Sequence, residues 1–154
     1  MAHSTTLLFL DFDGVLHPFP MPADPANLFC DLPRLEAVLR DFPAVQVVIS
    51  SSWHERYSFS ELARLFSPDI ARRVVGILPV IEIRSLADTN KIRYREIQQF
   101  LAGMPANWIA LDDDPSLFPN PCPHLIWCEE GFGEKEETEL RHAMQLLQEN
   151  SGWT

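Results

Sequence analysis

Residues 7–14 read Leu-Leu-Phe-Leu-Asp-Phe-Asp-Gly, a run of four apolar residues that ends abruptly in acids. A continuous apolar run of this length favours a strand that is buried on both faces. Asp11 and Asp13 are two residues apart in an extended segment, so both carboxylates can point to one side. Gly14 permits a tight turn directly after them. The stretch therefore predicts a buried strand that presents two acids at its carboxyl end.

Apolar segments and helical patterns alternate along the rest of the chain. We predict strands at 45–49, 108–111 and 125–127, a strand with a connecting loop over 74–83 that is broken at Pro79, and helices at 31–42, 58–66, 92–101 and from 134 onward. Asp31 is expected to cap the first helix. Ser58 and Glu61 match a capping box at the second, and Gly103 is expected to end the third. This alternation predicts an α/β fold, a doubly wound and mostly parallel sheet, in a single domain covering residues 1–154.

Polar residues follow three of the predicted strands where each one ends: Asp11 with Asp13, Ser50–Ser52, and Asp112–Asp114. Ligands of open parallel sheets bind beyond the carboxyl ends of the strands, so we expect the three clusters to converge. Oxygen-rich sites of this kind suit Mg²⁺, which takes one or two carboxylates and keeps waters that a phosphate oxygen can replace. Without an ion, converging carboxylates would repel one another and raise one another's pKa.

Composition narrows the possible functions. The 154 residues carry 12 Lys and Arg against 22 Asp and Glu, a formal charge of -10, which argues against extended nucleic-acid binding. The three cysteines form no CxxC pair, which favours reduced thiols and a cytoplasmic location. We expect neither a signal peptide nor a membrane span, and no membrane partner.

These residues resemble the haloacid dehalogenase (HAD) superfamily of phosphohydrolases. The first motif of that superfamily, a strand followed by DxDG, is similar to residues 7–16, and its second, a strand ending in Ser or Thr, is similar to residues 47–50. Lys91 is the best candidate for the third motif, a Lys opening a later helix. The fourth, a strand ending in paired acids, is similar to residues 109–113. All four occur in the order typical of the superfamily.

The resemblance implies a phosphatase with an aspartyl-phosphate intermediate. Asp11 would be the nucleophile, and Asp13 would protonate the leaving oxygen and later deprotonate the hydrolytic water. Mg²⁺ would be the cofactor, held by Asp11, the backbone carbonyl of Asp13 and Asp113.

The same resemblance implies contacts to the phosphoryl group. Ser50 would donate a hydrogen bond to a phosphoryl oxygen, and Lys91 would neutralise its charge. Asp112 would orient Lys91 or the metal ligands. Ser51 is an alternative to Ser50 if the strand runs one residue further, and Arg93 is an alternative to Lys91 because the helix start is ambiguous.

Three further residues near these motifs keep two interpretations each. His17 and His54 could contact the substrate or its leaving group, or lie on the surface of loops. Trp53 could stack on a ring or base, or pack in the core.

Spacing indicates that no full cap domain covers the site. The interval from Asp13 to Ser50 and the interval from Ser50 to Lys91 are each filled by a predicted helix and strand. We therefore expect an open site, covered only by residues 18–25 and 51–57. In the superfamily, such members act on phosphates of large molecules, so the expected partner is a phosphorylated small molecule, protein or nucleic-acid end.

A finer resemblance joins this chain to the small HAD domains grouped with RNA-repair proteins. It rests on Asp-Gly-Val-Leu-His-Pro at residues 13–18 and Ser-Ser-Trp at residues 51–53. Two other functions compete with a phosphatase: a non-catalytic module that binds phosphate or a partner on the same fold, and a receiver domain. A receiver places its phosphorylated Asp on a middle strand, whereas the strand at 45–49 ends in serine.

Overall fold

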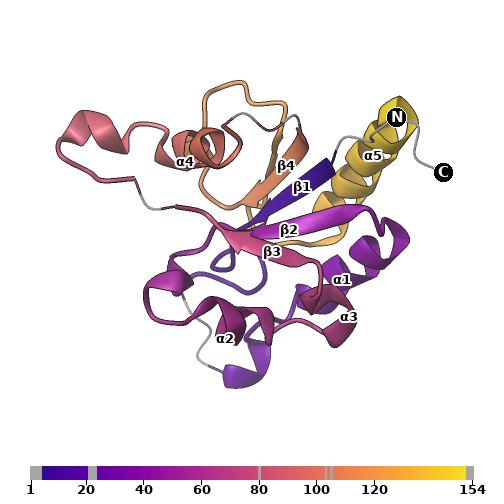
Figure 1. The fold of residues 1–154 in the computed structure, drawn as a ribbon. Coiled ribbons are helices and arrows are strands. Elements are labelled where there is room, and N and C mark those ends of the chain that lie inside the picture. Colours follow the sequence, from indigo (N-terminus) through magenta and orange to yellow (C-terminus); the bar gives the residue numbers. More distant parts are fainter. Residues whose placement is uncertain (1–4, 21–23, 80, 103, 105, 152–154) are drawn as a thin grey trace.

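The chain forms a single five-stranded parallel sheet in the order β3-β2-β1-β4-β5 (Figure 1). The computed structural model describes residues 5–20, 24–79, 81–102, 104 and 106–151. The strands are β1 (Thr5–Leu10), β2 (Val45–Ile49), β3 (Val74–Ile77), β4 (Ala106–Asp112) and β5 (Leu125–Trp127). Every strand pair is parallel, which confirms the predicted fold class.

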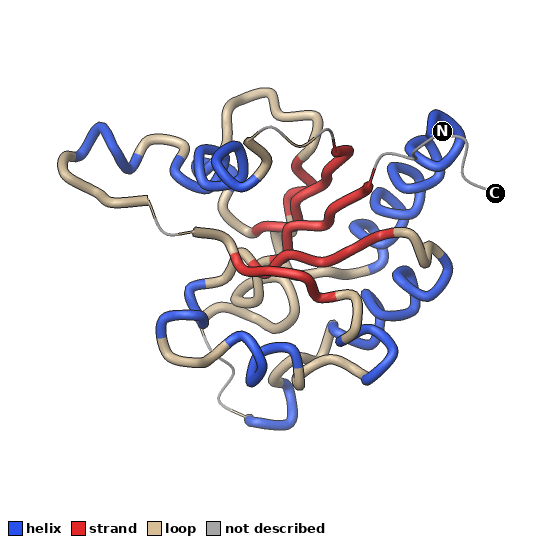
Figure 2. The backbone as a smooth tube through the Cα atoms, in the orientation of Figure 1, coloured by secondary structure: helices blue, strands red, loops and turns tan. Residues whose placement is uncertain are grey.

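Helices cover both faces of this sheet. They are α1 (Leu32–Asp41), α2 (Phe59–Ala63), α3 (Pro68–Ala71), α4 (Ile92–Phe100) and α5 (Glu134–Ser151), with short 3-10 turns η1 (Pro25–Asn27), η2 (Ser52–Glu55), η3 (Leu86–Thr89) and η4 (Pro115–Leu117). α1 packs against α3 and α5 on one face, and α4 covers the other face (Figures 1 and 2). None of the helices in the described part of the chain is long and apolar enough to cross a membrane.

The alternating side chains of β1 divide between two cores. Leu8 and Leu10 belong to the larger core beneath α1 and α5, whereas Leu7 and Phe9 belong to the core beneath α4. Each of these four side chains is at most 3% exposed. Because successive side chains of a strand point to opposite faces, a strand between two helical layers must be apolar throughout. This requirement explains the uninterrupted apolar run.

Two predicted elements are shorter in the structure. The helix expected at 58–66 stops at Ala63, and a separate helix, α3, begins at Pro68. Proline favours an extended conformation in the residue before it, and Ser67 has ψ 148°. The backbone N–H and the hydroxyl of Ser67 both donate to buried Glu36, each at 2.7 Å, which fixes the break. In the segment 74–83, expected to be a strand with a connecting loop broken at Pro79, the strand β3 ends at Ile77, two residues before that proline.

Of the three predicted helix ends, one is confirmed, one is wrong and one lies outside the described residues. The capping box of Ser58 and Glu61 is present with both hydrogen bonds. The prediction for Asp31 is wrong: this residue precedes α1, but its backbone is helical and its side chain makes no capping hydrogen bond. An N-cap oxygen reaches the first-turn N–H groups from an extended backbone, which Asp31 lacks. Gly103 lies outside the described residues.

Candidate active site

The three polar clusters converge because their strands are neighbours and end level with one another. Leu10, the last residue of β1, pairs with Ile49 of β2 and with Leu111 of β4. Beyond this level, the N–H of Asp11 donates to the carbonyl of Leu111 at 3.1 Å. On the other side, the N–H of Ser50 donates to the carbonyl of Leu10 at 2.9 Å. The carboxyl edge of the sheet thus gathers the residues that follow β1, β2 and β4.

Asp11, Asp112 and Asp113 form a group that we call the acidic cluster. Each contributes one carboxylate oxygen, and these oxygens lie within 4.8 Å of one another. Asp11 is 8% exposed and Asp112 is 1% exposed. The turn after β1 approaches this cluster so closely that a Cβ on Gly14 would collide with the Asp113 carboxylate, and Gly14 also has φ +78°. Both observations require glycine at this position.

Burial and mutual repulsion shift the pKa values in the acidic cluster. Burial, followed by the charge of Asp112, holds the pKa of Asp11 well above its usual range, and Asp113 adds to the effect. Burial likewise raises the pKa of Asp112 to about 6, although Arg93 lowers the pKa of both carboxyl groups. Three carboxylates that repel one another while sharing a small volume are a donor set that fits a hard divalent cation.

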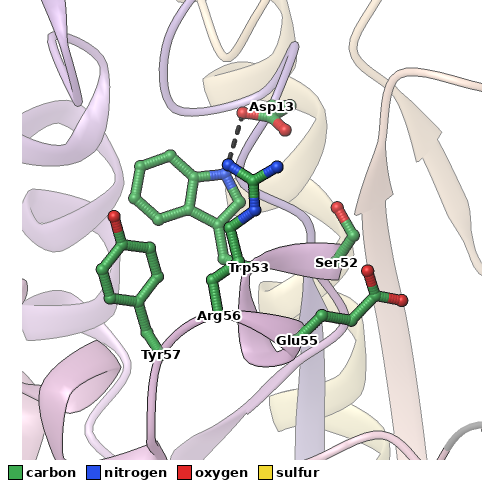
Figure 3. Close-up of a pocket in the computed structure, with 6 residues that line it drawn as sticks. All are labelled: Asp13, Ser52, Trp53, Glu55, Arg56 and Tyr57. Atoms are coloured by element: carbon green, nitrogen blue, oxygen red, sulfur yellow. Dashed lines mark hydrogen bonds between the residues drawn. The ribbon is translucent and has the colours of Figure 1, made fainter.

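Asp13 lies in a different environment from Asp11. Its carboxylate is not part of the acidic cluster. Instead, its Oδ1 lies 2.8 Å from Nε2 of His17 and accepts a hydrogen bond from Nε1 of Trp53 at 3.0 Å (Figure 3). His17 is fully buried rather than a surface residue, and Trp53 combines core packing with a polar contact to a candidate catalytic group. The sequence therefore predicted that two acids follow the first strand, but it did not predict that their surroundings differ.

The two candidate serines have different partners. Both Ser50 and Ser51 are buried. The hydroxyl of Ser51 accepts a hydrogen bond from the N–H of Trp53 at 3.3 Å and so caps η2. This bond turns the Ser51 hydroxyl toward the backbone of η2, whereas Ser50 is tied by its own N–H to the end of β1, which favours Ser50 as the residue beside the acids.

The two candidate cations also differ. Nε of Arg93 lies 3.5 Å from Oδ2 of Asp112, and Nη1 of Arg93 donates to Glu96 at 3.2 Å. The Arg93 side chain is only 17% exposed. Lys91 precedes α4 with φ 51° and lines a hollow of about 720 Å³ with Ser116 and Trp127. Arg93 is therefore the candidate that contacts the acidic cluster directly.

His54 and Glu96 are two further polar residues that contact candidate site residues: His54 contacts Ser51, and Glu96 contacts Arg93. Nδ1 of His54 lies 2.6 Å from the carbonyl of Ser51, and its buried Nε2 has no hydrogen-bond partner among the residues that the structure describes. Burial raises the pKa of Glu96, while the charges of Arg93 and His54 lower it. Glu96 was not predicted from the sequence, although its spacing of three residues from Arg93 is a typical helical ion-pair signal.

A pocket of about 300 Å³ opens beside Asp13 (Figure 3). The residues that line it are Asp13, Ser52, Trp53, Glu55, Arg56 and Tyr57. All except Asp13 belong to the segment 51–57, which was expected to cover the site. This segment is thus the wall beside Asp13.

The comparisons with known proteins yield one family. Its model matches residues 7–137 and is described as the HAD domain in Swiss Army Knife RNA repair proteins. The matched residues include all four sequence motifs and the wall at 51–57. The match favours this family over the receiver domain considered above. A search of the curated proteins and a search of the solved structures each found no match.

Proposed function

This chain belongs to the family of HAD domains in Swiss Army Knife RNA repair proteins, and we propose that it is a Mg²⁺-dependent phosphatase. The observation that carries the proposal is the pairing of Asp11, in the acidic cluster, with Asp13, two residues away and outside that cluster. A phosphatase of this kind needs one carboxylate as nucleophile and another as acid and base, and two different surroundings suit the two roles.

In the first half of the reaction, a carboxylate oxygen of Asp11 attacks the phosphorus of a phosphomonoester. A bond forms between this oxygen and phosphorus, and the bond from phosphorus to the ester oxygen breaks. The electron pair of the broken bond goes to the leaving oxygen, which takes a proton from Asp13. The products are an alcohol and an aspartyl-phosphate.

In the second half, water attacks the phosphorus of the aspartyl-phosphate. Asp13, now deprotonated, takes a proton from this water, and the bond between phosphorus and Asp11 breaks. Inorganic phosphate leaves, and both carboxyl groups return to their starting states.

Mg²⁺ fits the donor set at the carboxyl edge. Asp11 and Asp113, with the backbone carbonyl of Asp13, would hold the ion, and the charges that raise the pKa of Asp11 are those that a cation offsets. When bound, Mg²⁺ reduces the repulsion between the attacking carboxylate and the phosphate. Asp112 accepts a hydrogen bond from the N–H of Asp114 at 3.0 Å and lies against Arg93. These contacts suit a residue that orients the neighbouring cation or the metal ligands.

For the phosphoryl oxygens, we propose Ser50 and Arg93 as contacts, with Lys91 as the alternative cation. The observations in favour are the backbone bond that places Ser50 beside the end of β1, while Ser51 caps η2, and the proximity of Arg93 to the acidic cluster. The family description makes a phosphorylated RNA end the first substrate to test. An open pocket, bounded by residues 51–57 and without a full cap domain, suits a phosphate carried on a large molecule.

The proposal is tested by phosphate release. Purified protein is incubated with p-nitrophenyl phosphate and with 3′- and 5′-phosphorylated oligonucleotides, in Mg²⁺ and in excess chelator. We expect release in Mg²⁺ and none in chelator. Absence of release from every substrate would favour the non-catalytic module. In that case, beryllium fluoride with Mg²⁺ would also leave the melting temperature unchanged, because no aspartyl-phosphate mimic would form.

A further inference from the structure

The carboxylate of Asp13 is held at one oxygen by donors from two separate segments. His17 belongs to the same turn as Asp13, and its Nε2 lies 2.8 Å from Oδ1. Trp53 belongs to η2, after the neighbouring strand β2, and its Nε1 donates to the same Oδ1 at 3.0 Å. Two donors that reach one oxygen from different elements fix the rotation of the carboxylate plane. The other oxygen, Oδ2, takes part in neither bond.

A second contact of His17 indicates which of its two ring nitrogens carries the proton. Nδ1 of His17 accepts a hydrogen bond from the backbone N–H of Phe29 at 3.3 Å. An imidazole nitrogen that accepts a hydrogen bond carries no proton, so the neutral ring carries its proton on Nε2. In this tautomer His17 donates to Asp13 from Nε2. The His17 side chain is 0% exposed, which keeps the donor end of this bond out of water.

The indole of Trp53 is itself fixed in place. Its ring packs edge-on against Phe12 and Phe29, with ring centroids 5.8 Å and 5.2 Å apart. Tyr57 stacks on it at 5.5 Å with an interplanar angle of 28° (Figure 3), and the ring of His17 lies 5.7 Å away. Its backbone N–H donates to Ser51. A side chain held by these ring contacts and a capped turn keeps its N–H directed at Asp13.

We propose that His17 and Trp53 are positioning residues that occupy Oδ1 of Asp13 and thereby direct Oδ2 toward the leaving group. This inference rests on the proposed function, in which Asp13 protonates the leaving oxygen. The proton moves from Oδ2 to that oxygen as the bond to phosphorus breaks, and Oδ2 takes a proton from water in the second half. The Asp13 side chain is 25% exposed and lines the 300 Å³ pocket, so the leaving group lies in this pocket beside Trp53.

A positioning role and a purely structural role of Trp53 differ in their dependence on the leaving group. p-Nitrophenolate is stable as an anion and leaves without a proton, whereas the alkoxide of a primary alkyl phosphate needs one. A misplaced acid therefore slows the alkyl ester selectively. A general loss of folding or of phosphate binding slows both esters equally.

The test is kcat/KM for a primary alkyl phosphate and for p-nitrophenyl phosphate, since kcat/KM covers the steps up to release of the leaving group. Trp53→Phe keeps a ring but removes the N–H. We expect it to lower kcat/KM for the alkyl ester about 10-fold more than for the aryl ester, a part of the ~10²–10⁴-fold contribution of a general acid. Trp108→Phe is the matched control, because Trp108 is a buried indole beneath the other face of the sheet.

His17 supplies a second pair of variants. His17→Gln keeps an N–H donor of similar reach, and His17→Leu removes it. We expect the selective loss on the alkyl ester to be larger for His17→Leu than for His17→Gln. Melting temperatures of all variants establish that each is folded.

The outcomes separate the two proposals. Equal losses on both esters, or none on either, in folded Trp53→Phe would overturn the positioning role and leave the phosphatase assignment intact. Absence of phosphate release by the wild-type protein from both esters and from the phosphorylated oligonucleotides would overturn the proposed function, and the positioning role with it.

Discussion

Asp11 and Asp13 leave the same strand two residues apart, yet they enter opposite kinds of surroundings. Asp11 meets two carboxylates, and burial together with the charge of Asp112 holds its pKa well above the usual range. Asp13 meets two N–H groups, those of Trp53 and His17. The comparison teaches that the neighbouring strands, rather than residue type, determine the surroundings of each acid: β4 and the residue after it supply the acids around Asp11, and η2 after β2 supplies the indole at Asp13.

The largest expected effect comes from removing the nucleophile. Asp11→Asn should lower phosphate release by about 10⁴-fold or more, because the amide cannot form the aspartyl-phosphate. It should also raise the melting temperature of the metal-free protein, since one of three repelling acids is gone. Activity assays and thermal melts measure both effects. Asp41→Asn, an exposed partner of Arg141, is the control, and wild-type turnover in Asp11→Asn would refute the assignment.

The next effect distinguishes the two cations. Arg93→Met should lower kcat/KM by about 10²-fold, the typical cost of removing one group that stabilises transferred charge. Lys91→Met should cost less, because Arg93 is the residue in contact with Asp112. Steady-state kinetics of the two variants provide the measurement. A larger loss of kcat/KM in Lys91→Met would reverse this order and would indicate that Lys91, rather than Arg93, contacts the phosphate.

These cations illustrate what sequence patterns could and could not predict. The convergence at the carboxyl edge was predictable, because parallel strands place their ends together and each polar cluster follows an apolar run. The choice between Lys91 and Arg93 was not, because it depends on the left-handed backbone of Lys91 at the start of α4. The bond from Trp53 to Asp13 joins residues 40 positions apart, and no local periodicity encodes such a contact.

A smaller effect tests whether the ion binds at the acidic cluster rather than at the carboxylate of Asp13. Mg²⁺ at about 100 times its dissociation constant should raise the melting temperature of the wild-type protein by about 5–10 °C. Asp113→Asn should lose most of this shift. Asp13→Asn should keep it, because the carbonyl of Asp13 remains. Loss of the shift in Asp13→Asn alone would show that the Asp13 side chain holds the ion.

The smallest effect is a pH dependence in the acidic cluster. Burial raises the pKa of Asp112 from 3.8 to about 6, so the folded protein binds this proton more tightly than the unfolded chain does. The resulting stabilisation is full below pH 3.8 and is lost as the pH rises through about 6. In chelator, the melting temperature of Asp112→Asn relative to wild type should therefore rise by up to about 5–10 °C between pH 4 and pH 7, as much as the Mg²⁺ shift at most. A constant difference would contradict the shift.

The close approach of Gly14 to Asp113 has a consequence for how the site receives an ion. The backbone of Gly14 lies against the side chain of Asp113, with no room for a Cβ between them. The positions of Asp11 and Asp113 are set by this contact and by the pairing of β1 with β4, whose ends lie side by side. Folding itself brings the three carboxylates together despite their repulsion, so a cation bound there would offset a repulsion that the folded chain already contains.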